Sequence, residues 1–242
     1  LANGIEANKF YGLTGAIAVT LEAAAPAGRF TVDANGTKVD FASGNLWYGK
    51  ADGETTAAFH FEADQWSSAS TWDASHVSNF KWSDAANAVT DNTTYSGTLF
   101  CASNFTVDGE AGWSTLSKDE WVYLMNTRTV NGGTGEGKSY QRATVNGVYG
   151  LILYPDNYTG QTTATSYTSA EWTSMESDGV VFLPAAGYRY GTNMYDVGSY
   201  GYYWSSTLNG TSSAFRLSFD SGGVNPQGST GRIRGYSVRL VR

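Results

Sequence analysis

The chain has 242 residues, enough for one large domain or two small ones, and its 15% charged residues, 29 glycines and 16 tyrosines favour strands, turns and irregular loops over long helices. The net charge of −7 argues against a nucleic-acid partner, because binding to a phosphate backbone needs a cationic surface. The single cysteine, Cys101, excludes an internal disulfide and is expected to be a small buried side chain.

Residues 1–28 are expected to be a lead-in or the end of a preceding domain. Their longest apolar run, AIAVTLEAAAPA, contains Glu22 and is too short to cross a bilayer, so no membrane insertion is expected in this segment. The domain itself is expected to cover residues 29–242. It opens with a predicted hairpin, because alternating apolar residues flank the tight-turn pair Asn35 and Gly36.

The middle of the chain combines aromatic loops with a helix. Residues 57–115 are rich in aromatic side chains but have no periodicity, which predicts long ordered loops whose rings insert into a core. A helix is then predicted over residues 117–128. Ser117 and Glu120 have the spacing of a capping box, in which each side chain bonds the other residue's backbone amide.

A second short helix is predicted over residues 169–177, capped near Thr168 or Ser169 and stopped by Gly179. Strands are predicted around these helices at residues 143–155, as one strand or as a pair with a turn at Asn146 and Gly147, and at residues 179–184, 201–207, 213–219 and 236–242. This order favours an α+β class, with two helices separate from short antiparallel strands.

Motifs for enzyme chemistry and cofactors are weak. The segment GGTGEGKS, residues 132–139, matches the pattern of a phosphate-binding loop, but a helix is predicted before it and strands after it. A phosphate loop needs the opposite order, because the following helix N-terminus holds the anion. His60 and His76 lack metal-ligand spacing, and Cys101 has no activating signature. We therefore expect no cofactor, no metal and no catalytic residue.

The last quarter of the chain is the strongest candidate for a binding surface. Tyrosines gather there among serine, asparagine, threonine and glycine, a composition typical of adaptable recognition surfaces. Leu217 and Phe219 are predicted to face a core, while Arg216, Ser218 and Asp220 alternate onto the opposite face. The plainer alternative is that these tyrosines and glycines only fill turns, and that the C-terminal arginines lie on solvated strand edges and form structural ion pairs.

Several separated segments carry a resemblance to a known family. They are FLPAAGYR, GYYWSST, the spaced Ala214, Leu217 and Phe219, and GYSVRLVR, with KVDFASGNLWY, LSKDEWVYLMNTR and ATVNGVYGLILYPD upstream. Together they resemble surface proteins of gut Bacteroidales that have a C-type lectin fold. The resemblance covers about residues 29–242, and it implies long ordered loops and an extracellular or cell-surface location.

Within that family, the chain most resembles the variable proteins of diversity-generating retroelements, whose C-terminal segment is rewritten by mutagenesis at adenines. The resemblance implies a diversified segment over about residues 188–242, held by a constant framework of Trp204, Ser205, Ser206, Ala214, Leu217, Phe219, Arg232, Gly235, Ser237, Val238, Arg239 and Leu240. The ligand-binding positions that we expect are Tyr190, Asn193, Tyr195, Tyr200, Tyr202, Leu208, Asn209, Thr211, Ser213, Phe215, Arg216, Ser218, Asp220, Gly223, Asn225, Ser229, Thr230, Ile233, Arg234 and Tyr236.

Codon chemistry agrees with this division. Adenine changes in AAC codons can produce the residues at Tyr195, Tyr202, Leu208, Thr211, Ser213, Phe215, Arg216, Ser218, Asp220, Ile233, Arg234 and Tyr236, although Gln227 cannot arise in this way. The expected function is therefore non-catalytic, adhesin-type binding of an unknown protein or glycan on another cell or phage. The alternatives are a fixed fimbrial or surface-layer subunit and, less favoured, an enzyme similar to the formylglycine-generating sulfatase-modifying proteins. A single cysteine argues against the enzyme.

Overall fold

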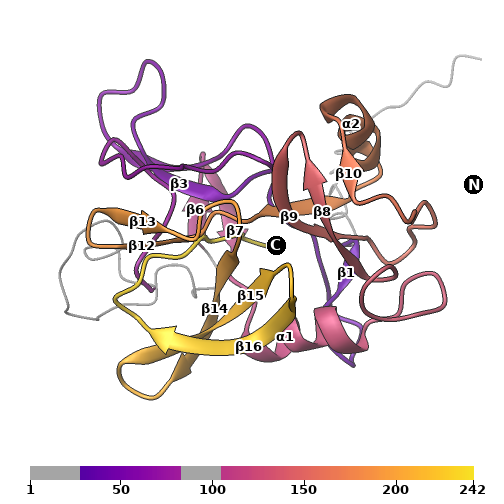
Figure 1. The fold of residues 1–242 in the computed structure, drawn as a ribbon. Helices are drawn as coiled ribbons and strands as arrows, with labels where there is room; N and C mark the ends of the chain where they lie inside the picture. Colours follow the sequence, from indigo (N-terminus) through magenta and orange to yellow (C-terminus); the bar gives the residue numbers. More distant parts are fainter. Residues whose placement is uncertain (1–27, 83–104) are drawn as a thin grey trace, which may run out of the picture.

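A computed structural model describes residues 28–82 and 105–242 of the chain (Figure 1). The expectations for the lead-in up to residue 27 and for Cys101 lie outside the described residues. The strands are β1 (Phe30–Thr31), β2 (Lys38–Val39), β3 (Leu46–Gly49), β4 (Ala58–Phe61), β5 (His76–Val77), β6 (Phe105–Val107), β7 (Glu110–Trp113), β8 (Tyr140–Val145), β9 (Val148–Leu153), β10 (Ser166–Tyr167), β11 (Val181–Pro184), β12 (Tyr188–Tyr190), β13 (Asn193–Tyr195), β14 (Gly201–Asn209), β15 (Ser213–Asp220) and β16 (Gly223–Gly231). The helical segments are α1 (Lys118–Val122), the π-helical η2 (Tyr123–Thr127) and α2 (Ser169–Ser177).

The expected α+β class, with a C-type lectin-like fold and long ordered loops, is wrong. The described residues are mostly β, with 42% in strands and 10% in helices, and the strands form many small sheets. The reason is local: the stretch expected to be loops contributes the short strands β4 to β7, while the two helices are only five and nine residues long. The helices are therefore too short to form a separate layer against one sheet.

Two hairpins form where asparagine-glycine pairs predicted them. β1 and β2 pair antiparallel across a turn in which Gly36 has φ of 83°. β8 and β9 pair antiparallel around Asn146 and Gly147, whose φ angles of 48° and 82° suit a tight two-residue turn. A positive φ at both positions is costly for most side chains, so the sequence pair and the turn geometry agree.

Both predicted helices begin where expected. Ser117 caps α1 and Thr168 caps α2, each through a complete capping box with the glutamate three residues later. The first helix departs from α geometry after Val122 and continues as η2, while α2 ends before Gly179, which has φ of 86°.

The C-terminal strands were predicted in part. β14 and β15 lie at the predicted positions, and β16 completes a three-stranded antiparallel sheet in the order β14-β15-β16. β16 was not predicted. The predicted strand over residues 236–242 is wrong, because this stretch forms only isolated bridges: Tyr236 with Phe80, Ser237 with Tyr203, and Val241 with Phe41 and Ser114.

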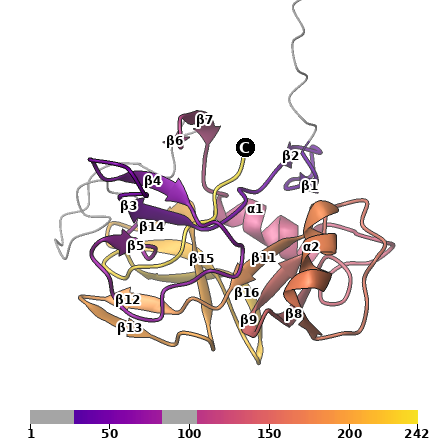
Figure 2. The ribbon, with the colours of Figure 1, turned by 90° about the horizontal axis from the view of Figure 1, so that it is seen from above.

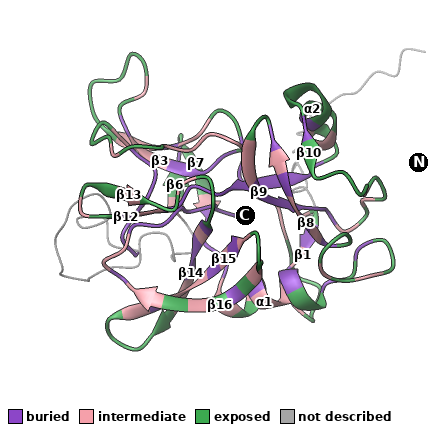
Figure 3. Ribbon diagram, viewed as in Figure 1, coloured by how far each residue is buried: buried purple, intermediate pink, exposed green. Residues whose placement is uncertain are grey.

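The views from two sides show how these parts surround the core. Strands β3 to β5 and β12 to β14 lie on one side, β8, β9, β11 and α2 on the other, and β15, β16 and α1 between them (Figure 2). Burial follows this arrangement, because the inner strands are buried whereas much of α2 and β13 is exposed (Figure 3). One buried cluster contains Trp204, Ala214, Tyr236, Val238 and Leu240, and it underlies the predicted binding segment.

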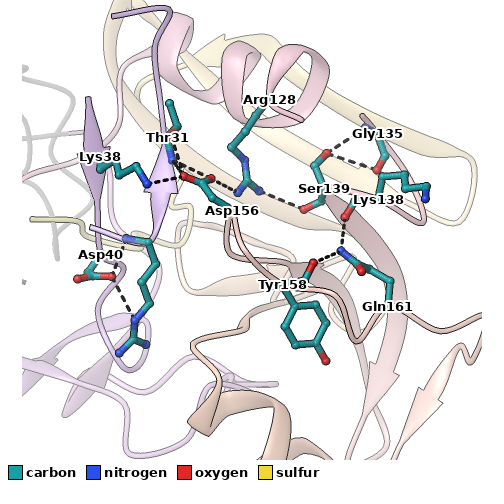
Figure 4. A network of polar contacts seen from close by, with 11 residues as sticks. Thr31, Lys38, Asp40, Arg128, Gly135, Lys138, Ser139, Asp156, Tyr158 and Gln161 are labelled. Carbon is teal, nitrogen blue, oxygen red and sulfur yellow. Dashed lines mark hydrogen bonds and ion pairs between the residues drawn. The ribbon is translucent and has the colours of Figure 1, made fainter. Parts of the chain in front are cut away.

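A polar network around Asp156 ties the first hairpin to the middle of the chain (Figure 4). The Asp156 carboxylate accepts hydrogen bonds from the Thr31 amide at 3.1 Å and the Thr31 hydroxyl at 2.6 Å. It also pairs with the buried Arg128 guanidinium at 2.9 Å and with Lys38 Nζ at 3.3 Å. Burial acts to raise the pKa of Asp156, but the bonds from Thr31 and Arg128 outweigh it and hold this pKa below its ordinary value.

Candidate functional site

Burial separates the two sets of residues predicted for the C-terminal segment. Of the predicted framework, every residue except Ser206 is buried. Of the predicted ligand-binding positions, every residue except Tyr236 is at least partly exposed. The described residues with large exposed hydrophobic side chains are Tyr190 at 50%, Tyr195 at 41%, Tyr200 at 37% and Leu208 at 47%, and all four belong to the predicted binding positions.

The strand β15 shows the physical basis of this separation. Leu217 and Phe219 are buried in the core, whereas Arg216, Ser218 and Asp220 are only partly buried, as their alternation predicted. Pairing with β14 on one side and β16 on the other fixes this register. A slip of one residue would expose Leu217 and Phe219, so the register is strongly specified.

A groove of about 320 Å³ lies on the outer face of this sheet. Its lining residues are Tyr200, Tyr202, Arg216, Ser218, Phe219, Asp220, Gly223, Val224 and Asn225. All of them except Phe219 and Val224 were predicted binding positions. The groove is therefore built within residues 200–225, which the consecutive strands β14, β15 and β16 bring side by side.

A connected set of tyrosine rings, which we call the tyrosine array, runs from the groove to β12 and β13. It consists of Tyr188, Tyr195, Tyr200, Tyr202 and Tyr236. The Tyr200 and Tyr202 rings are near parallel with centroids 5.8 Å apart, and the Tyr202 and Tyr236 rings stack at 4.9 Å. Tyr188 continues the array by stacking on Tyr195 at 5.1 Å and meeting Tyr202 edge-on at 5.8 Å. Such ring pairs add stability beyond the area they bury, so the rings of the array support one another.

Two arginines lie over the tyrosine array. The Arg216 guanidinium is 4.8 Å from the Tyr202 ring centroid and 5.5 Å from that of Tyr236, and Arg234 is 4.9 Å from the Tyr188 centroid. Neither guanidinium forms an ion pair with a described residue. The remaining C-terminal arginines have structural contacts. Arg242 forms an ion pair with Glu110, as the plainer alternative proposed. Buried Arg239 instead donates to Asn45 and to the carbonyls of residues 42 and 182, and buried Arg232 donates to the carbonyl of residue 211.

Two aspartates accept hydrogen bonds from tyrosine hydroxyls of the array. The Tyr202 hydroxyl donates to Asp196 at 3.2 Å, and burial together with the Asp196 charge raises the pKa of Tyr202. A hydrogen bond to Asp220 raises the pKa of Tyr200. The Asp220 carboxylate also accepts from the amides of Gly222 and Gly223 at 2.7 and 3.0 Å, which fixes it at the β15–β16 turn.

Not all predicted positions lie at the groove. A second group lies at the opposite end of the sheet, about 20 Å along β14 by strand geometry; it consists of Leu208, Asn209, Thr211, Ser213, Ser229 and Thr230. Phe215 faces α1, where Lys118 Nζ is 5.4 Å from its ring centroid. Tyr190 and Asn193 belong to the β12–β13 hairpin, and Ile233 follows β16.

Tyr236 differs from every other predicted binding position. Its side chain is only 1% exposed, and it packs against Trp204 with ring centroids 4.5 Å apart. Its backbone pairs with that of Phe80. Tyr236 is therefore the buried base of the tyrosine array, and it can affect a ligand only through the rings above it.

Sequence reasoning missed Tyr188, Asp196, Phe219 and Val224 as contributors to this face. Tyr188 had a usable signal, because it belongs to the same run of tyrosines as Tyr190. Val224 had none, since β16 itself was not predicted.

The other motifs carry no site in the described residues. The GGTGEGKS segment is a loop with η2 before it and β8 after it, opposite to the order that holds a phosphate. His60 and His76 lie on either side of Trp47, at centroid distances of 4.6 and 4.1 Å, and contact Asp108 and Glu62 at 2.6 and 2.7 Å. No group of three metal-ligating side chains occurs among residues 28–82 and 105–242.

A larger hollow of about 630 Å³ lies between Arg29, Lys38, Tyr158 and Asp178. Gly28, the first described residue, is part of its lining, and we assign this hollow no role. Across residues 28–82 and 105–242, no helix combines the length and the apolar character needed to cross a membrane.

The fold and this face describe a mostly β protein with a tyrosine-rich groove on a three-stranded sheet. A family model described as a domain of unknown function, DUF8237, matches residues 161–241, which include the whole groove. No curated protein and no solved structure matches the chain significantly.

Proposed function

We propose that this protein binds an external ligand non-covalently through the groove and the exposed rings of the tyrosine array. The observation that carries the proposal is the placement of the large exposed hydrophobic side chains. Four described residues have such side chains: Tyr195 and Tyr200 belong to the tyrosine array, Tyr190 lies in the same hairpin as Tyr195, and Leu208 lies at the far end of the sheet. Exposed aromatic surface of this kind is costly unless a partner covers it, and rigid tyrosines bind with little loss of conformational entropy.

The proposal includes diversification of this face at the cell surface, in keeping with the resemblance to retroelement variable proteins. The separation by burial supports it, because changes at exposed positions leave the core intact whereas changes at the framework would not. The neighbouring DNA tests it directly. A near-copy of the codons for residues 188–242, differing only at adenines and beside a reverse transcriptase gene, is the expected finding. Its absence would favour a fixed adhesin.

A binding screen tests the proposed face itself. The chain is probed against arrayed glycans and extracellular proteins, beside a groove variant carrying Tyr200→Ala and Asn225→Ala. We expect at least one ligand of the wild type to be lost by the groove variant. Lys138→Ala, in an exposed loop outside the face, is the matched control and should keep every ligand.

The same screen examines the alternative of a structural subunit. Leu208→Ala changes the far end of the sheet and shows whether that end also contributes to ligand binding. If the groove variant loses self-association and no other partner, the face is an assembly surface and the receptor-type proposal fails.

A further inference from the structure

The Arg216 guanidinium is held at the groove without a hydrogen-bond acceptor. The centroids of the Tyr202 and Tyr236 rings lie within 5.5 Å of it. The ring faces attract the cation but accept no hydrogen bond from it. Its Nε and Nη1 atoms are buried and have no hydrogen-bond partner in the structure. Such donors are nearly always satisfied in proteins, so a turn of the Arg216 side chain toward an acceptor in the groove would satisfy donors that are unpaired while the groove is empty.

The strand beside Arg216 has no side chain at the position that faces its guanidinium. Gly228 pairs with Arg216 across β15 and β16, and a Cβ at Gly228 would lie only 3.0 Å from Arg216 Nη1. The missing side chain therefore lets the guanidinium lie against β16. Arg216 keeps this position beside two polar groove residues, Ser218 and Asn225.

From this geometry we propose that the ligand bound at the groove is an acidic sugar unit of a glycan, and that Arg216 recognises its carboxylate. This inference rests on the proposed function and gives its ligand a chemical class. A guanidinium matches the planar geometry of a carboxylate and forms charge-assisted hydrogen bonds with it. A carboxylate carries a single negative charge. One arginine can balance that charge, even though Asp220 lines the same groove and the chain has a net charge of −7.

The groove suits a sugar better than a peptide. Its 320 Å³ is near the lower end of ligand sites, which span about 300–1,000 Å³, so it accommodates a small unit. Ser218, Asp220 and Asn225 offer the mixed donors and acceptors that sugar hydroxyls need. Strand addition by a peptide is disfavoured, because β16 is an edge strand that contains Pro226, which has no amide donor.

The test is an NMR titration of the isotope-labelled chain with matched probes. The acidic probes are the methyl glycosides of glucuronic acid, galacturonic acid and N-acetylneuraminic acid. Methyl glucoside and methyl galactoside are the neutral controls, and N-acetylglutamate methylamide represents a peptide carboxylate. We expect an acidic sugar to shift the amides of β14 to β16 and to bind roughly tenfold or more tightly than the neutral sugars.

Three arginine variants test whether Arg216 causes the preference for acidic sugars. Arg216→Gln should bring acidic-sugar affinity down to that of the neutral sugars, and Arg216→Lys should recover only part of it, because lysine lacks the planar fork. Arg242→Gln removes an exposed arginine outside the groove and should bind as the wild type does. Unchanged thermal unfolding of each variant shows that folding is intact.

Three outcomes overturn the inference: equal binding of acidic and neutral sugars or of none, unchanged binding by Arg216→Gln, or preference for the glutamate probe. The binding screen described under the proposed function separates failure of the acidic-sugar inference from failure of the proposed function. A ligand that depends on Tyr200 but carries no carboxylate leaves the binding function standing. If no ligand depends on Tyr200, the binding function itself fails.

Discussion

Replacing Tyr236 with alanine tests whether this tyrosine supports the face or belongs to it. Its ring is 1% exposed and packs against Trp204 and Tyr202, with centroids at 4.5 and 4.9 Å. Removing a fully buried aromatic ring leaves a cavity and costs about 3–5 kcal/mol. Tyr200 is 37% exposed and contacts the array on one side, so Tyr200→Ala should change the free energy of unfolding by no more than about 1 kcal/mol.

Urea unfolding followed by tryptophan fluorescence measures both values. The slope against urea should be the same for each variant, so that the shift in midpoint reports stability. Tyr236→Phe is the control, since it keeps the ring and should cost less than about 1.5 kcal/mol. If Tyr236→Ala is no more destabilising than Tyr200→Ala, then Tyr236 does not support the array and the division of this face by burial is mistaken.

Three further predictions concern the scaffold. Asp156→Asn should destabilise the chain by about 2–4 kcal/mol at neutral pH, because Arg128 loses its charged partner. The folded-state pKa of Asp156 lies below its ordinary value, so its contribution is present at neutral pH and is lost as the pH falls through that lowered pKa. The difference between wild type and Asp156→Asn should therefore shrink on acidification, and a difference constant down to pH 2 would contradict the network. Gly147→Ala should cost about 1–2 kcal/mol in urea unfolding, since φ is 82° there; no loss would mean that the turn relaxes. Thr168→Ala should cost about 1 kcal/mol by removing the cap of α2, while Thr168→Ser should be nearly neutral; equal losses for the two would contradict the cap.

Local signals in the sequence predicted local structure well. The capping boxes at Ser117 and Thr168, and the turns at Gly36 and Gly147, each depend on a few neighbouring residues. All the interactions that form them are made by residues a few positions apart, so the local sequence pattern is sufficient to predict them.

Features with a weak local pattern, or with partners distant in the sequence, were missed or wrong. β16 has the sequence GVNPQGSTG, which lacks apolar alternation and contains a proline, and it is a strand because β15 pairs with it. The terminal YSVRLVR alternates like a strand, yet its neighbours are separate segments that supply only single bridges. The expected fold class failed because the short strands β4 to β7 formed where the aperiodic, aromatic-rich sequence had predicted long loops.

The candidate face shows the same division. Alternation along β15 placed Arg216, Ser218 and Asp220 outward without knowledge of the fold. Tyr236 was misjudged because its residue type matches the surface tyrosines, and only the positions of Trp204 and Phe80 decide that it is buried.

The bridges made by residues 235–242 also set an order of events during synthesis. Arg239 bonds Asn45, which lies 194 residues earlier, and Val241 pairs with Phe41 and Ser114. On the ribosome these early segments emerge long before their partner exists, so the core beneath the tyrosine array can close only after the last arginines have left the exit tunnel. Contacts this distant fold slowly, and Leu46 and Phe80, which pack in the same cluster as Val238 and Leu240, stay exposed on the nascent chain until then.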